Sequence, residues 1–201
     1  MDCYVDDEEE GEDFLITLEA DETGAFGATL DLTVYDGRYL TAIATDDAGN
    51  TSPFSRPAPI DFTPPVLQLT GAAELTLECG APFDDPGATA TDNIDGNLNN
   101  QLVATIQDDQ GAALASLDGA APGVYTVVYS VSDSSGLAAA PVSRTVVLED
   151  TTAPTVTLNG AESLVLGCGE AFSDPGATAQ DGCESDLAVP VSGTVDSAAP
   201  G

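Results

Sequence analysis

Two kinds of side chain in this sequence could do chemistry: closely spaced acidic residues and four cysteines. The segment Asp92-Asn93-Ile94-Asp95-Gly96-Asn97 alternates oxygen-bearing side chains around a glycine, as loops that coordinate Ca²⁺ can do. It lacks the twelve-residue spacing and the terminal bidentate Glu of an EF-hand. The competing interpretation is a plain turn, because Asp and Asn favour turns by bonding to their own backbone.

The cysteines favour a structural bond over a catalytic or metal site. Cys168 and Cys183 lie near each other in the sequence, so we expect a disulfide, worth ~3 kcal/mol in the chain-entropy picture. Cys79 and Cys3 then have no assigned partner, and they bond to each other, to a neighbouring chain or to nothing. Because the sequence has no Cys-x-x-Cys pair and no His, neither thiolate ligation of zinc nor an activated nucleophile is expected.

The charge of the chain excludes several classes of partner. It has 35 acidic residues, three arginines (Arg38, Arg56 and Arg144) and no Lys, giving a formal net charge of −32. Binding to nucleic acids or to anionic membranes requires clustered basic residues on the protein, so neither is expected as a partner. No stretch approaches the ~20 apolar residues of a membrane helix, so no membrane insertion is expected. Since 42% of the residues are hydrophobic, we expect a folded protein rather than an acidic tail.

An internal repeat organises the chain. Residues 61–96 return as residues 150–185, with Cys79 falling on Cys168 and Phe83 on Phe172, at an offset of 89. The second copy lacks the two alternating β-type runs that follow Gly123 in the first copy, so we expect the natural chain to continue beyond Gly201.

Short alternating runs bounded by Gly, Pro, Asn and Asp recur throughout, and no long helical periodicity is visible. The sequence therefore predicts an all-β fold of tandem immunoglobulin-like β-sandwiches, the first and last incomplete in this chain. We expect one domain at 1–60 without its N-terminal strands, a complete domain at 61–149, and a third at 150–201 without its C-terminal strands.

This organisation gives the acidic residues a place to meet. In a sandwich, the turn before the last strand lies at the same pole as the incoming linker. We therefore expect the linker residue Asp61 to approach Asp133, and Asp92 or Asp95, between the first and second domains. The corresponding set at the next joint is Asp150, Asp181 and Glu184, and Ca²⁺ is the expected cofactor of both sets.

The motif Asp-Pro-Gly-Ala-Thr-Ala at 85–90 and 174–179, followed in the first copy by the β-type run 123–133, resembles a bacterial immunoglobulin-like repeat. This repeat is found in pesticidal crystal proteins and large surface proteins, and the resemblance covers residues 61–201. Residues 1–60 are similar to a second such repeat type, found in giant adhesins. That resemblance implies a linear array at the cell surface or in the medium, with calcium stiffening linkers through aspartates.

The expected function is therefore a structural stalk or spacer of a secreted or cell-surface, adhesin-like protein. Two alternatives stay open: a subunit of an extracellular filament completed by strands from neighbours, and spacer repeats attached to a secreted hydrolase. The expected partners are neighbouring domains of the same or adjacent chains. An enzyme is not expected, because Trp is absent and aromatic residues make up 5% of the chain, too few for an aromatic-lined cleft.

Overall fold

The computed structural model describes residues 1–6, 13–23, 25–185 and 187–198. Within these ranges the regular structure consists of β-strands and two short 3₁₀ turns, η1 (Thr33–Tyr35) and η2 (Asn99–Gln101), with no α-helix. The prediction of an all-β, immunoglobulin-like fold is confirmed. No helix in this part of the chain is long and apolar enough to span a bilayer.

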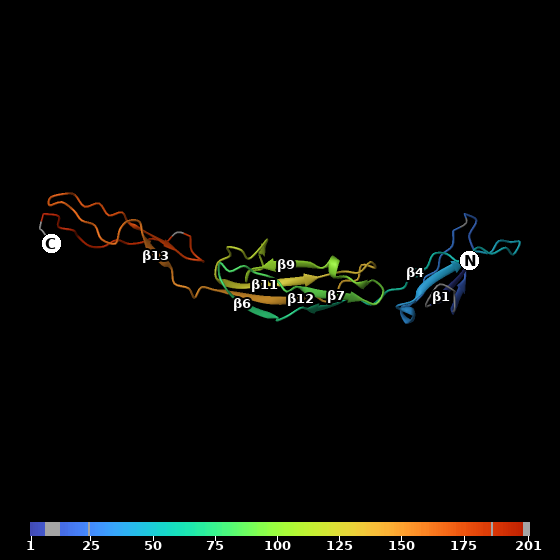
Figure 1. The fold of residues 1–201 in the computed structure, drawn as a ribbon. Coiled ribbons are helices and arrows are strands. Elements are labelled where there is room, and N and C mark those ends of the chain that lie inside the picture. Colours follow the sequence, from blue (N-terminus) through green and yellow to red (C-terminus); the bar gives the residue numbers. More distant parts are fainter. Residues whose placement is uncertain (7–12, 24, 186, 199–201) are drawn as a thin grey trace. The chain divides into compact units, whose positions relative to one another are not determined.

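The N-terminal segment, at the blue end of the ribbon in Figure 1, forms a four-stranded sheet. Its strand order is β2-β1-β3-β4. Its strands are β1 (Asp2–Asp6), β2 (Asp13–Thr17), β3 (Tyr39–Ile43) and β4 (Ala58–Pro59). Strand β1 pairs antiparallel with both β2 and β3, and it buries Cys3 and Val5 on one face. The acidic run between β1 and β2 falls largely on residues 7–12, outside the described residues.

Residues 66–149 contain two further sheets. One has the order β5-β7-β8, from β5 (Val66–Leu69), β7 (Ala88–Asp92) and β8 (Gly96–Asn97). The other has the order β10-β9-β11-β12-β6. Its strands are β6 (Glu74–Glu78), β9 (Val103–Gln107), β10 (Ala113–Leu114), β11 (Gly123–Ser130) and β12 (Val142–Glu149). Strand β6 pairs parallel with β12 and so covers what would otherwise be an open sheet edge.

Alternation along these strands builds the core. Strand β11 buries every second side chain from Tyr125, and β12 does so from Arg144. A separate buried cluster joins β7 to the chain after β11 and consists of Ala90, Leu98, Val131 and Ala139. This cluster packs β7 against chain segments that follow β8 and β11.

One buried charge explains part of the repeated motif. Arg144 is fully buried; its Nε donates to the carbonyl of Ala72 at 3.0 Å and its Nη1 to Asp85 Oδ1 at 2.9 Å. A buried guanidinium requires such partners, because an uncompensated buried charge destabilises strongly. The aspartate of the Asp-Pro-Gly motif therefore holds strand β12 in the first copy.

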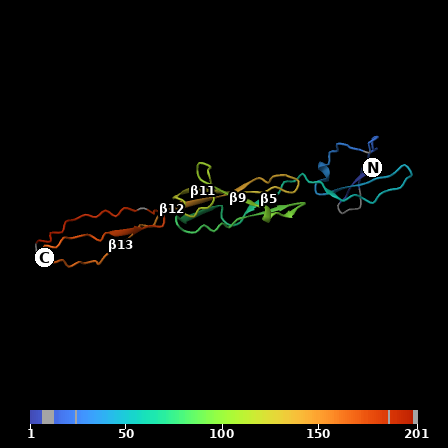
Figure 2. The ribbon, with the colours of Figure 1, turned by 90° about the horizontal axis from the view of Figure 1, so that it is seen from above.

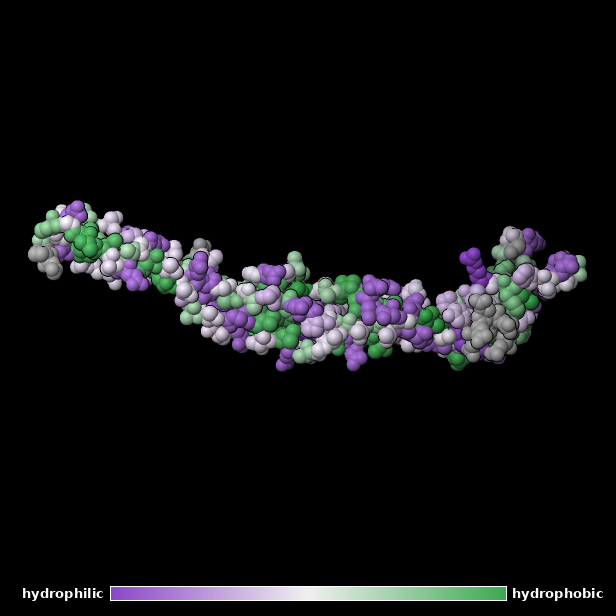
Figure 3. All heavy atoms as spheres, in the orientation of Figure 1, coloured by the Kyte–Doolittle hydropathy of each residue, from purple (hydrophilic) through white to green (hydrophobic). Residues whose placement is uncertain are grey.

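The second copy of the repeat forms β13 (Thr155–Leu158) and β14 (Ala177–Gln180), paired antiparallel. Thr155 faces Gln180 in this pair as Val66 faces Thr91 in the first copy, so the register is the same. The rest of the described segment 150–198 runs as irregular chain (Figure 2). Val156 is 58% exposed, and hydrophobic residues show at the surface of this segment in Figure 3.

The chain divides into two compact units that do not follow the sheets. The first comprises residues 1–71, 86–104 and 128–143, and the second residues 72–85, 105–127 and 144–201. The division crosses β9, β11 and β12, so the three-domain boundaries expected from the sequence stay a prediction. Each acidic cluster described below lies within a single unit.

Candidate metal centre

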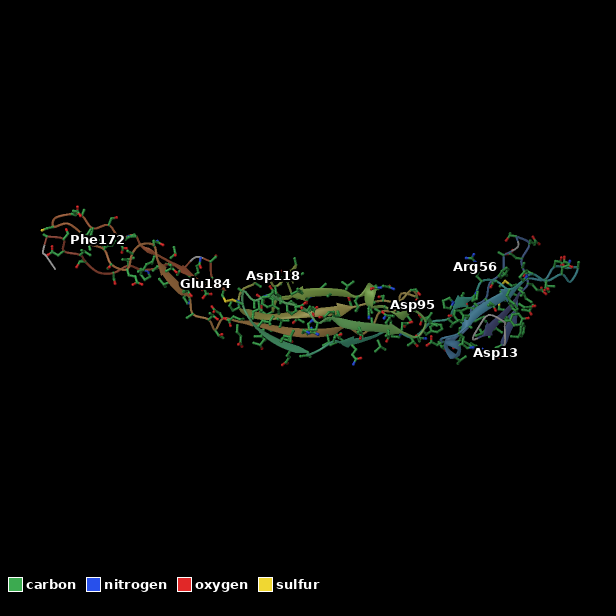
Figure 4. The ribbon with its side chains drawn as sticks, viewed as in Figure 1. Asp13, Arg56, Asp95, Asp118, Phe172 and Glu184 are labelled. Atoms are coloured by element: carbon green, nitrogen blue, oxygen red, sulfur yellow. A yellow bond between two sulfur atoms is a disulfide. The ribbon has the colours of Figure 1, made fainter. Side chains whose placement is uncertain are left out.

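Three aspartates converge in the first unit. Asp61 lies in the linker before β5, Asp95 between β7 and β8, and Asp133 in the turn after β11. One carboxylate oxygen from each lies within 4.8 Å of the other two. Asp95 lies beyond the ends of the strands of this sandwich (Figure 4). The structure thus brings together the linker residue and turn residues that the sequence predicted to meet.

Local hydrogen bonds fix these loops. Asp92 Oδ1 accepts the backbone N–H groups of Ile94 and Asp95 at 2.8 and 2.9 Å, which closes the turn after β7. Asp95 Oδ2 accepts the N–H of Ser134 at 2.7 Å, which ties this turn to the one that carries Asp133. This bond therefore holds the two turns side by side.

The unusual property of the cluster is its unsatisfied oxygens. Asp133 is only 7% exposed, and its Oδ2 is buried without a hydrogen-bond partner in the described structure. The same holds for Oδ2 of Asp61 and of Asp92. A buried carboxylate oxygen without a donor costs free energy, and neighbouring like charges add to that cost. A bound cation would remove both penalties, and carboxylate oxygens are the ligands that Ca²⁺ prefers.

The turn at Asp46 has the same backbone hydrogen bonds as the turn at Asp133 but lies outside the carboxylate cluster. The turn at Asp46 is closed by Gly49 and Asn50 as the turn at Asp133 is closed by Gly136 and Leu137. Asp46 is exposed, and its Oδ2 accepts the side-chain amide of Asn50 at 2.7 Å. The Asn50 bond is the largest factor that lowers the pKa of Asp46. Turn formation therefore accounts for Oδ1 of Asp133, but it leaves Oδ2 unexplained.

Two carboxylates that the sequence did not single out, Asp36 and Glu78, hold the segments that follow Asp61 and Asp150. Asp36 accepts the N–H of Phe62 at 2.6 Å and the hydroxyl of Thr63, and the Thr63 bond is the main cause that lowers the pKa of Asp36. Glu78 accepts hydrogen bonds from the N–H groups of Thr151 and Thr152 at 2.8 and 2.9 Å.

Glu78 also accepts the Thr151 hydroxyl at 2.7 Å, and this bond leads the contacts that lower the pKa of Glu78 to about 2. Glu78 could not be identified as an acceptor from sequence, because it ends a strand and has no turn signature. Its counterpart in the second copy is Gly167.

At the linker that contains Asp150, the residues that lie together differ from the expected set. Asp150 lies with Glu78 and Cys183 in a set of potential ligand atoms within 4.8 Å of one another. Within the described ranges, Asp181 and Glu184 do not join Asp150 in such a set. Instead Asp181 Oδ1 accepts the N–H of Cys183 at 2.7 Å, and Glu184 is exposed.

The disulfide joins Cys79 to Cys183, with their Cα atoms 5.4 Å apart (Figure 4). The expected Cys168–Cys183 bond is therefore wrong. Gly80 and Gly182 let the two backbones approach so closely that a Cβ at Gly80 would lie 2.4 Å from the Gly182 carbonyl oxygen. Cys168 is an exposed free thiol, and Cys3 is a buried one. Nearness in the sequence misled the prediction, because the bond crosses from one repeat to the next.

Known proteins resemble parts of this chain. It is 26% identical over 140 residues to an outer cell wall protein of Brevibacillus brevis, a match covering 65% of this chain and 14% of that protein. The chain thus spans about a seventh of the length of that curated relative. A lipoprotein structure from Bacteroides thetaiotaomicron is 28% identical, covering 44% of this chain and 39% of its own, with a TM-score of 0.34.

The family comparison covers more of the chain. Residues 67–148 and 156–201, together more than half of the sequence, match the family described as "Bacterial surface protein, Ig-like domain". The match takes in both copies of the repeat, and with the cell wall relative it places the chain at the bacterial cell surface. The chain therefore belongs to the Ig-like domain family of bacterial surface proteins.

Proposed function

We propose that this chain is a spacer segment of a cell-surface protein, built from domains at 1–60, 61–149 and 150–201, whose first joint binds Ca²⁺. The single observation that carries the calcium proposal is the convergence of Asp61, Asp95 and Asp133 around buried, unpartnered carboxylate oxygens. The surface-protein family and the cell wall relative support a structural, non-enzymatic role.

The donor set favours a hard divalent cation. All three converging groups are carboxylates, and the chain has no His to attract a transition metal. Asp95 and Asp133 belong to turns that are closed by backbone N–H groups donating to aspartate Oδ1 atoms, so little ordering of these two ligands remains to oppose binding. Irregular oxygen ligands from loops suit Ca²⁺ better than Mg²⁺, which demands near-ideal octahedral geometry.

The proposed ion would act on the linker. Asp61 is the only one of the three ligands that belongs to the linker, while Asp95 and Asp133 belong to turns at the ends of strands. Asp36 already accepts two hydrogen bonds from residues directly after Asp61. Calcium would add a second attachment of the linker, through Asp61, and a spacer needs such fixed linkers to keep its domains in place.

Thermal unfolding with and without calcium tests the proposal. We expect calcium to raise the melting temperature of the wild-type chain, and chelator to reverse the effect. Asp133→Asn should abolish this shift, because it removes the charge of the most buried ligand. Asp46→Asn is the matched control: it alters the same type of turn outside the cluster, so the shift should persist.

Small-angle scattering tests the spacer clause separately. Calcium should narrow the distribution of interatomic distances in the wild-type chain but not in Asp133→Asn. A calcium-dependent melting shift with identical scattering profiles would overturn joint stiffening and leave binding intact. Equal melting shifts in wild type and Asp133→Asn would overturn the site itself.

A further inference from the structure

The disulfide depends on a sequence element that occurs twice. Cys79 follows β6 in the segment Leu75–Gly80, and the same pattern of Leu-x-Leu-x-Cys-Gly returns at Leu164–Gly169. The other half of the bond, Asp181-Gly182-Cys183, belongs to the second copy. One repeat thus supplies the Cys-Gly turn, and the following repeat supplies the Asp-Gly-Cys loop.

The contact in the first case is specific. Gly80 adopts φ +76°, and its missing side chain makes room for the carbonyl of Gly182. Asp181 closes the loop by accepting the N–H of Cys183, which presents the sulfur to Cys79. A Cβ at Gly182 would lie 3.5 Å from the carbonyl oxygen of Cys79, which is ordinary van der Waals contact, so a branched side chain is needed there to separate the two turns.

The second copy keeps a Cys-Gly turn of the same backbone conformation, and there the Gly169 N–H donates to the Ser197 carbonyl at 2.9 Å. Gly169 has φ +82°, and no described atom lies within 4 Å of the position that its Cβ would take. Cys168 is an exposed free thiol whose sulfur lies 3.8 Å from the carbonyl oxygen of Ala198. The glycine conformation that admits Gly182 in the first copy is thus repeated beside an unbonded cysteine.

We propose that the Cys168-Gly169 turn receives the Asp-Gly-Cys loop of another repeat of this kind and forms with it a disulfide equivalent to Cys79–Cys183. Successive repeats are then linked covalently, each through its Cys-Gly turn to the next Asp-Gly-Cys loop. This inference does not depend on calcium binding or on the spacer function.

The chemistry is thiol–disulfide exchange with a low-molecular-weight disulfide as oxidant. The Cys168 thiolate attacks the oxidant, forms a mixed disulfide and releases one thiol. The thiolate of the incoming cysteine then attacks the Cys168 sulfur and releases the second thiol. Two protein thiols are oxidised, and one small disulfide is reduced to two thiols.

Two full-length variants make the proposal testable. The acceptor chain carries Cys3→Ser and keeps Cys168 as its free thiol. The donor chain carries Cys3→Ser, Cys79→Ser and Cys168→Ser, so that Cys183 is its free thiol. The chains are mixed with oxidised and reduced glutathione, and peptide mass spectrometry quantifies the Cys168–Cys183 heterodimer. We expect it to exceed either homodimer at least about fivefold at redox equilibrium.

Two controls separate specific docking from simple thiol reactivity. Gly182→Val in the donor and Gly169→Val in the acceptor should each remove the heterodimer preference, because each fills the space between the turns. Labelling of Cys168 by a small thiol reagent should be unchanged by Gly182→Val in the opposite chain. A heterodimer no more than about twice as abundant as either homodimer, the ratio that random thiol pairing gives, or one insensitive to Gly182→Val, would overturn the proposal.

Discussion

The linkers that contain Asp61 and Asp150 share one kind of hydrogen bonding and differ in a second kind of contact. In each, a carboxylate accepts backbone N–H and hydroxyl groups from the residues that follow the linker aspartate. Asp36 does this for Phe62 and Thr63, and Glu78 does it for Thr151 and Thr152. The second contact is an aspartate cluster at the first linker and a disulfide at the second.

The difference shows how one repeat can be adapted. Residue 94 is Ile in the first copy, whereas its counterpart in the second copy is Cys183. The loop that contributes Asp95 to the carboxylate cluster thus contributes a sulfur to a covalent bond in its second occurrence. We infer that the first linker is sensitive to cations and the second to reductants.

The largest expected effect comes from breaking the disulfide. Cys79→Ser should lower the free energy of unfolding by roughly 4–5 kcal/mol, because the bond joins residues separated by 104 positions. Denaturant unfolding under non-reducing conditions measures the loss. Cys168→Ser is the matched control and should leave stability unchanged. The opposite ranking of the two variants would mean that Cys183 bonds to Cys168.

An effect of intermediate size is expected when the two linker aspartates are substituted and the stabilisation by calcium is compared. Asp61→Asn should remove the stabilisation by calcium, about 2.7 kcal/mol at a hundredfold excess of calcium over the dissociation constant. Asp150→Asn, at the equivalent position of the second repeat, should retain it. Unfolding curves with calcium and with chelator provide the comparison. Equal loss in both variants would show that the two linkers do not differ in cation binding.

The smallest expected effect concerns pH at the second linker. Hydrogen bonds from Thr151 and Thr152 lower the pKa of Glu78 to about 2, from 4.5 in the unfolded chain. The contribution of Glu78 to stability is therefore complete above pH 4.5 and disappears as the pH falls through about 2. Glu78→Gln should lose stability relative to wild type at neutral pH, and the difference should shrink over this interval.

Glu74→Gln, at the opposite end of β6, is the control for Glu78→Gln. Thermal unfolding from pH 7 to pH 2 measures both variants against wild type. A constant difference between wild type and Glu78→Gln across the whole range would contradict the assignment of these hydrogen bonds to an ionised carboxylate.

The sequence predicted what depends on local pattern. Alternation of apolar residues indicated the strands, and the repeat offset reproduces the common register of β5 with β7 and of β13 with β14. The meeting of Asp61 with Asp95 and Asp133 was also predictable, because a linker and the turns at one pole of a sandwich must lie close.

Contacts that depend on side-chain burial or on the next repeat were not predictable. The role of Arg144 required knowing that Asp85 lies beside β12, and the role of Glu78 required knowing where the chain turns after Glu149. The disulfide was misassigned because spacing along the chain cannot show that Gly80 and Gly182 bring two repeats into backbone contact.

Calorimetric titration of the full chain with calcium tests the central claim most directly. We predict binding that Asp133→Asn abolishes and Asp46→Asn leaves intact, because Asp133, unlike Asp46, contributes a buried, unpartnered oxygen to the cluster. Absence of calcium binding by the wild-type chain, or equal binding by both variants, would contradict it.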